Sequence, residues 1–178
     1  MVNEWDLKLG VSPIRLAVTA GAYVGTYELG GLSLQKLSIR DGAAKTSVNF
    51  ASPNPSQLES LIYETGASTV TLSGLSDANF KKLQFKGGAG SFTFDFSGQL
   101  RTSGSVTIDA GVSKLHVIVP AGTAAKVSVN GKLADVTQEG TWTVTDKTYS
   151  TPAAASSGGK ALTITVNMDV GSLTITSN

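Results

Sequence analysis

Four hydroxyl side chains and the single histidine of this 178-residue chain recur at nearly constant intervals, so they are well placed to act as a group. The five residues are Thr26, Ser47, Thr71, Thr93 and His116. A straight outward row of hydroxyl groups can hydrogen-bond repeatedly to an extended glycan or to a protein partner. The alternative is that threonine stands at these positions because its branched side chain suits an exposed β-strand. We take this row as the candidate partner-binding face.

Catalytic chemistry finds less support in the sequence. Ser33 and Lys36 have the Ser-x-x-Lys spacing of penicillin-recognising serine enzymes, but their segment is strand-like and the other motifs of that mechanism are missing. Glu28 and Asp95 occupy equivalent outward positions three repeats apart, about 14 Å at one strand spacing per repeat. Paired carboxylates that act on one glycosidic bond lie roughly 5 to 9.5 Å apart. We therefore expect no catalytic residues and no enzyme.

Metal and cofactor sites are also not expected. Gly87 begins a segment like the calcium-binding nonapeptide of β-roll proteins, but the position that must supply a carboxylate is Phe92. The chain has no cysteine, and His116 alone cannot form a zinc site. No glycine-rich segment has the further glycine or the lysine of a nucleotide-binding loop. The sequence therefore predicts no metal and no cofactor.

The charge balance limits the classes of partner. Fourteen basic and 13 acidic residues give a net charge of +1, and neither sign forms a block along the sequence. We therefore expect no nucleic-acid partner. No apolar run has the 18 to 20 residues of a spanning helix, so we expect no membrane insertion by this segment. Met1–Trp5 lacks the features of a signal peptide, and we expect that a native export or anchor segment is missing from this sequence.

The elements that must position the hydroxyl row form a repeat aligned on glycine. An apolar residue, a spacer, a second apolar residue and two spacers precede each glycine, and apolar and polar residues alternate after it. Such alternation is typical of β-strands, and glycine suits a tight corner because it reaches positive φ without a clash. The glycines, 21 to 24 residues apart, are Gly21, Gly42, Gly66, Gly88 and Gly111.

Stacked strand–corner–strand units predict an all-β fold, a parallel β-solenoid of roughly 22-residue repeats with atypical capping units at both ends. An ordinary β-sandwich is the alternative, but it does not explain the repeated register. We expect residues 1–178 to form one solenoid domain, with core repeats at about 10–130 and a C-terminal capping region at about 131–178. Two interior ladders are predicted: Leu16, Leu37, Leu61, Leu83 and Val106, and Tyr27, Val48, Leu72, Phe94 and Val117.

The two ends of the sequence depart from the repeat. Trp5 and Trp142 fall in the terminal units, where a large ring can shield the end of a core. Near the C-terminus the frame returns once, with Val166, Met168 and Gly171 in the places of the two apolar residues and the glycine. We expect this last repeat to belong to the C-terminal cap.

Several segments resemble the bacterial toast-rack domain family, which is related to the C-terminal domain of LiaF-type cell-wall-stress regulators and to adhesin-like β-solenoids. The similar segments span nearly the whole chain; they are Val48–Pro55, Ser73–Phe80, Phe85–Gly98 and the close of the chain from Tyr149 through Leu162–Val166 to Gly171–Ile175. The resemblance implies a parallel β-solenoid attached to a bacterial membrane protein or exported. It implies no activity and no functional residues.

Together, the residues and the resemblance predict a non-enzymatic scaffold or sensor domain of the bacterial cell envelope, extracytoplasmic or membrane-tethered. Such a domain would present a flat solenoid face to a protein partner. The alternative is a glycan-binding or adhesive module that uses the hydroxyl row. A degenerate polysaccharide-active enzyme is the third hypothesis. Aromatic rings beside the row would favour the glycan, two carboxylates in one pocket would favour the enzyme, and a scaffold needs neither.

Overall fold

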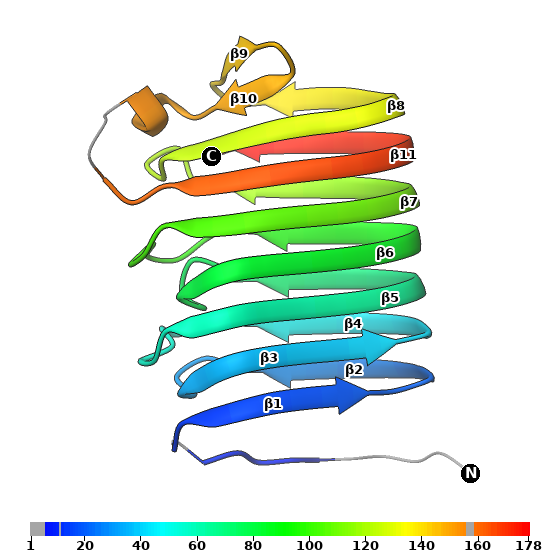
Figure 1. Cartoon of the computed structure of the whole chain (residues 1–178), viewed down its shortest axis with the longest axis vertical. Helices are drawn as coiled ribbons and strands as arrows, with labels where there is room; N and C mark the ends of the chain where they lie inside the picture. Colours follow the sequence, from blue (N-terminus) through cyan, green and yellow to red (C-terminus); the bar gives the residue numbers. More distant parts are fainter. Residues whose placement is uncertain (1–5, 11, 156–158) are drawn as a thin grey trace.

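The computed structural model describes residues 6–10, 12–155 and 159–178, without the side chains of residues 132–134. It is a parallel β-solenoid, which confirms the predicted fold class (Figure 1). Its elements are β1 Ile14–Thr19, β2 Ala22–Glu28, β3 Leu34–Asp41, β4 Ala43–Asn49, β5 Leu58–Ser73, β6 Phe80–Asp95, β7 Gly104–Val119, β8 Ala125–Glu139, β9 Thr143–Thr145, β10 Thr148–Ser150, a 3-10 helix at Pro152–Ala155, and β11 Leu162–Ser177.

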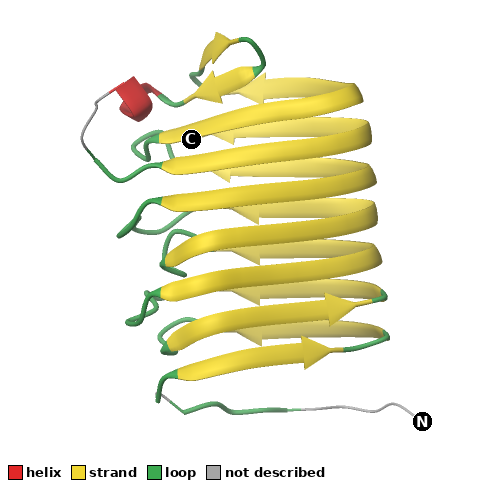
Figure 2. Cartoon of the chain, in the orientation of Figure 1, coloured by secondary structure: helices red, strands yellow, loops and turns green. Residues whose placement is uncertain are grey.

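Each coil of the solenoid is a U with two arms (Figures 1 and 2). The front sheet contains β1, β3 and the first halves of the long strands, and the back sheet contains β2, β4 and their second halves. In β5, β6, β7, β8 and β11 the backbone passes through the corner as one continuous strand. Loops at the opposite, open side connect one coil to the next (Figure 2).

Both predicted interior ladders are confirmed by the pairing of the strands. Leu16 lies opposite Leu37 in the front sheet, and Tyr27 lies opposite Val48 in the back sheet. The same register continues through β5, β6 and β7 to the last predicted members, Val106 and Val117. Because every coil repeats the alternation of the previous one, the buried rows are continuous along the stack.

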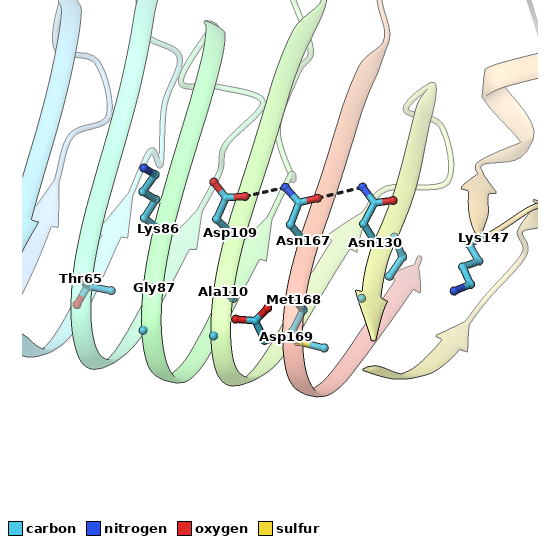
Figure 3. A pocket seen from close by; sticks show the side chains of 14 residues that line it. Thr65, Lys86, Gly87, Asp109, Ala110, Asn130, Lys147, Asn167, Met168 and Asp169 are labelled. Carbon is cyan, nitrogen blue, oxygen red and sulfur yellow. Dashed lines mark hydrogen bonds between the residues drawn. The ribbon is translucent and has the colours of Figure 1, made fainter. Parts of the chain in front are cut away.

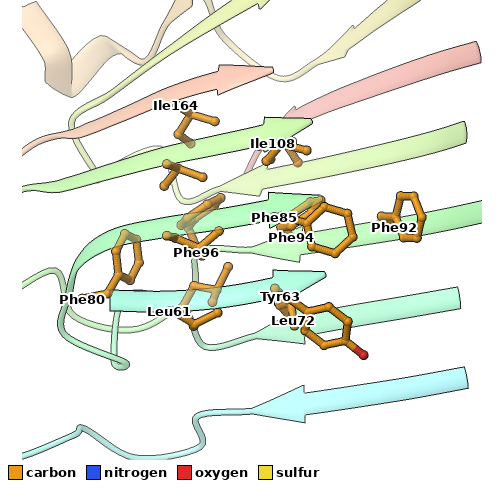
Figure 4. Close-up of a cluster of buried hydrophobic side chains, with 14 of the residues drawn as sticks. Leu61, Tyr63, Leu72, Phe80, Phe85, Phe92, Phe94, Phe96, Ile108 and Ile164 are labelled. Atoms are coloured by element: carbon orange, nitrogen blue, oxygen red, sulfur yellow. The ribbon is translucent and has the colours of Figure 1, made fainter. Parts of the chain in front are cut away.

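Aromatic side chains fill the middle of this core (Figure 4). The Phe85 ring contacts Phe92 and Phe94 edge-on, with ring centroids 4.8 and 4.9 Å apart. Tyr63 on the preceding coil packs against Phe85 at 5.7 Å. All four rings are fully buried. The middle coils are therefore held together by large apolar contacts across and between the two sheets.

The corner glycines are needed for a different reason from the predicted one. None of the five has a positive φ. Instead, the corners at Gly42, Gly66, Gly88 and Gly111 each pass close to the backbone of the preceding coil, whereas nothing lies near the Cβ position of Gly21. A Cβ on Gly88 would lie 2.7 Å from the carbonyl oxygen of Gly66, and one on Gly111 would lie 2.5 Å from that of Gly88. Glycine recurs because neighbouring backbones approach closely at the bend.

The position of β11 corrects the expected C-terminal cap. This strand lies inside the stack, between β7 and β8, and pairs in parallel with both along its length (Figure 1). Val166 lies opposite Ile108, so it holds the second apolar place of the frame and not the first. The reason is that β8 does not pair with β7. The two strands lie one coil apart, and the C-terminal strand β11 occupies the place between them.

The end of the stack beyond β8 is covered by the antiparallel hairpin of β9 and β10. β10 pairs with the front half of β8, and Trp142 and Tyr149 pack against the buried core. Trp142 donates its indole N–H to the carbonyl oxygen of Glu139 at 2.9 Å. This arrangement matches the capping role expected of Trp142. The other expected cap residue, Trp5, lies outside the described residues.

A polar cluster lies at the corner of the first coils. The Asp41 carboxylate accepts hydrogen bonds from Tyr63 Oη at 2.7 Å and from the Thr65 hydroxyl. Tyr23 joins the cluster by accepting a hydrogen bond from Tyr27 Oη at 3.0 Å. Burial raises the pKa of Tyr63 above its ordinary value of 10, and the hydrogen bond to Asp41 raises it further. Burial and the Tyr23 contact raise the pKa of Tyr27 in the same direction.

This cluster predicts a loss of stability in alkali. The folded state keeps the phenol proton of Tyr63 where the unfolded chain, with a pKa of about 10, releases it. The stabilising contribution is complete below about pH 10 and is lost as the pH rises further. We expect the free energy of unfolding, measured by urea titration from about pH 8 to pH 11.5, to fall above pH 10. Tyr63→Phe should weaken that dependence, and Tyr149→Phe is the control; equal slopes in both variants would contradict the prediction.

Candidate functional site

The five predicted row residues lie side by side on the outer face of the back sheet. Strand pairing places Thr26 opposite Ser47, then Thr71, Thr93 and His116 in successive coils. β11 and β8 extend the row with two more threonines, Thr174 and Thr137. Their side chains are exposed or half-buried, whereas in β4, β5, β6, β7 and β11 the residues on either side of them are buried in the core. The hydroxyl row therefore runs over seven adjacent coils.

The next outward row, nearer the open side of the coils, carries charged and polar groups. Asn49 donates its side-chain amide to Glu28 at 2.9 Å. At the other end, His116 Nε2 lies 2.9 Å from Thr176 Oγ1, and that hydroxyl donates to Glu139 at 3.0 Å. These hydrogen bonds join side chains of neighbouring coils and fix their orientation on the outer face of the sheet. The face thus offers ordered hydroxyl, amide and carboxylate groups.

Among the described residues, no aromatic side chain accompanies the hydroxyl row on its outer face. Tyr63 and the phenylalanines of the described core are buried, and Trp142 and Tyr149 belong to the cap. Tyr23 and Tyr27 face inward in β2 and are half-buried. The described residues of this face would therefore offer a sugar ring hydrogen-bonding groups but no aromatic platform. This arrangement fits a protein surface better than a sugar-stacking site.

A second candidate site is a shallow groove at the corner, of about 800 Å³, which runs across several coils (Figure 3). Its lining combines small residues such as Gly87, Ala110 and Gly131 with a row of polar side chains. The strand register places Lys86, Asp109, Asn167 and Asn130 next to one another in that order. Lys147 of the cap lines the groove beyond Asn130 (Figure 3).

The side chains in the groove form a hydrogen-bonded track. Asn130 donates to Asn167 at 3.0 Å, and Asn167 donates to Asp109 at 2.6 Å. Toward the N-terminal coils the same row continues with Glu64 and Arg40, whose side chains form an ion pair at 2.8 Å. This alternating row thus reads Arg40, Glu64, Lys86, Asp109, Asn167 and Asn130.

This alternating row was not among the sites predicted from the sequence, although part of its signal is present there. Arg40, Glu64, Lys86 and Asp109 each precede a corner glycine by two residues, and their charges alternate in sign. Their alignment could have been found from the repeat. The contributions of Asn167 and Asn130 could not, because their place depends on the insertion of β11 between β7 and β8.

Two carboxylates, Asp109 and Asp169, line this groove. Two carboxylates in one pocket are the feature that would favour the enzyme hypothesis. Asp109 is held by the amide of Asn167, and Asp169 follows two residues later on that neighbouring strand. The groove is an open surface channel, and no histidine lines it. Among the described residues, no group of three or more histidine and acidic side chains is arranged to hold a metal ion. The arrangement can bind polar ligands by hydrogen bonds, but it lacks an enclosed acid–base pair.

No described helix is both long enough and apolar enough to span a membrane. The fold and its flat outer faces define this chain as a β-solenoid repeat domain. Residues 54–118 match the family model described as the N-terminal domain of toast_rack, DUF2154. This match confirms the predicted toast-rack resemblance over that part of the chain.

A solved structure from Clostridium sporogenes, described as a "putative cell adhesion protein", shares the fold with a TM-score of 0.59. The two sequences are 11% identical, and the likeness covers 92% of this chain and 93% of that one. At this identity the likeness establishes a common fold and says nothing of a common ligand. No curated protein sequence matches this chain.

Proposed function

We propose that this domain is a non-enzymatic scaffold or sensor module of the bacterial cell envelope, which binds a protein partner through the hydroxyl row of its back sheet. The observation that carries the proposal is the continuity of that row over seven coils. A rigid stack of parallel strands holds each hydroxyl at a fixed spacing of about 4.8 Å, so little ordering is needed on binding.

The envelope location and the non-enzymatic role are supported by the toast-rack match and by the adhesion-related description of the structural neighbour. Charged residues flank the row on both sides: Glu28, Asp95 and Glu139 lie nearer the open side, and Lys45 and Lys114 lie nearer the corner. A row of ordered polar side chains with charged residues on both sides is compatible with a reversible protein interface.

A retention experiment on the immobilised domain tests this proposal. Envelope proteins and cell-wall glycan fragments of the source bacterium are passed over the wild type and over two triple variants. The back-face variant is Thr26→Lys, Thr71→Lys and Thr93→Lys. The matched front-face variant is Ser38→Lys, Gln84→Lys and Thr107→Lys. All six positions lie on outward rows, so we expect both variants to keep their free energy of unfolding within about 0.5 kcal/mol for each substitution.

We expect one protein, identified by mass spectrometry, to be retained by the wild type and by the front-face variant and lost from the back-face variant. Its affinity for the purified domain should fall at least about tenfold with the three lysines. Retention of glycan fragments with the same loss would establish the adhesive alternative. Equal retention by both variants would exclude the hydroxyl row as the binding face.

A further inference from the structure

The strand register gathers cations that are scattered in the sequence. On the outer face of the front sheet, the row nearest the open side of the coils consists of Arg15, Lys36, Ser60, Lys82, Ser105, Thr163 and Lys126. Four of these seven side chains are basic and the other three carry hydroxyls. The basic side chains are all exposed. We call this set the basic row.

Little negative charge opposes the basic row. At the start of the described front strands, the acidic residue beside the basic row is Glu59. Its carboxylate lies 3.8 Å from Lys36 Nζ, and both side chains remain about half exposed. Lys81, next to Lys82, adds a further exposed cation. The adjoining outward row is uncharged from β1 to β8; it consists of Ala17, Ser38, Ile62, Gln84, Thr107, Thr165 and Ser128.

The spacing of these cations indicates which kind of anionic partner the basic row can bind. At one strand spacing per coil, the cations extend over about 29 Å along the stack but occupy one residue position across it. Lys36 and Lys82 lie about 10 Å apart, and Lys82 and Lys126 about 14 Å apart. A single small anion cannot bridge such distances. A linear polymer with closely spaced negative charges can satisfy every cation at once.

A planar anionic membrane fits the face less well. A plane laid on the front sheet would also meet Glu64 and Asp109 of the alternating row, which lies four residues further along each strand than the basic row. A chain that follows the basic row avoids those carboxylates, because the uncharged row separates them from it. Ser60, Ser105 and Thr163 stand between the cations and can donate hydrogen bonds to phosphate oxygens.

We propose that the basic row binds a linear polymer of repeating phosphate groups, which lies along the solenoid axis on the front sheet. This site is on the opposite sheet from the hydroxyl row, so its failure and the failure of the proposed function are separable. Aromatic rings that could stack on bases are missing from the described part of this face, which favours a phosphate polymer over single-stranded nucleic acid.

Long-chain inorganic polyphosphate is the probe, and its affinity for the intact domain is measured by isothermal titration calorimetry at low and at physiological salt. The test variant is Lys82→Glu with Lys126→Glu. The matched control is Lys45→Glu with Lys114→Glu, which makes the same charge change at exposed positions of the back sheet. Lys82→Gln with Lys126→Gln replaces the test variant if charge reversal prevents folding, and circular dichroism verifies the fold of each.

We expect polyphosphate to bind the wild type, to bind at least about tenfold more weakly at the higher salt, and to lose about tenfold or more in the test variant. The control pair should lose less than about threefold. An equal loss in both pairs, or no binding at low salt, would overturn the proposal. Tighter binding to vesicles with anionic lipids, or to a single-stranded oligonucleotide, would also overturn it and would identify a different partner class.

Discussion

Phe94→Ala is expected to lower the free energy of unfolding by about 3 to 5 kcal/mol, which is the usual cost of removing a buried phenylalanine ring. Phe94 is fully buried, and its ring packs edge-on against Phe85 at 4.9 Å. It also continues the interior ladder between Leu72 and Val117. Alanine would leave a cavity where three coils meet, and the surrounding sheet is too rigid to close it.

Urea denaturation followed by circular dichroism measures this loss. Phe94→Leu is the control, because it keeps most of the apolar volume and should cost less than about 1.5 kcal/mol. Thr93→Ala, at the neighbouring outward position, should change stability by less than about 0.5 kcal/mol. A loss below 1 kcal/mol for Phe94→Ala would contradict the register described above.

Gly111→Ala should destabilise the domain by about 1 to 3 kcal/mol, whereas Gly21→Ala should have almost no effect. Both glycines hold the same position in the repeat. A methyl group on Gly111 would lie 2.5 Å from the carbonyl oxygen of Gly88, well inside van der Waals contact, and the backbone of a paired coil cannot move away. Nothing lies within 4 Å of the same position at Gly21, because no coil precedes it among the described residues.

Thermal and urea unfolding of the two variants provide the comparison. The pair removes the usual ambiguity of glycine substitutions, since both variants reduce the flexibility of the unfolded chain to the same extent. If Gly21→Ala costs as much as Gly111→Ala, corner geometry within one coil, and not the approach of neighbouring coils, would be the reason for the repeated glycine.

The repeat itself determined most of the fold. Apolar residues at fixed distances from each glycine predicted both interior ladders and the outward position of the hydroxyl row, because a period of two assigns each side chain to one face of a strand. Local sequence was sufficient here, since each coil pairs with the next along the chain from β3 to β7. The predicted reason for the corner glycines, a positive φ, was wrong. The actual constraint is the close approach of the backbone of another coil.

The tertiary structure alone decided where the last strand lies and which charges meet. Nothing in the local pattern of Leu162–Ser177 distinguishes an internal coil from a terminal one, because either neighbour offers the same backbone hydrogen bonds and the same apolar rows. The insertion of this strand brings Asn167 between Asp109 and Asn130 and completes the groove.

Charge shows the same division between sequence and structure. The sequence contains nearly equal numbers of acidic and basic residues without a block of either sign, and it therefore predicted no concentrated positive surface. Parallel pairing places residues that are more than 20 positions apart at one strand spacing, so Arg15, Lys36, Lys82 and Lys126 share a row. The sequence determined which side chains face outward, and the stacking of the coils decided which of them act together.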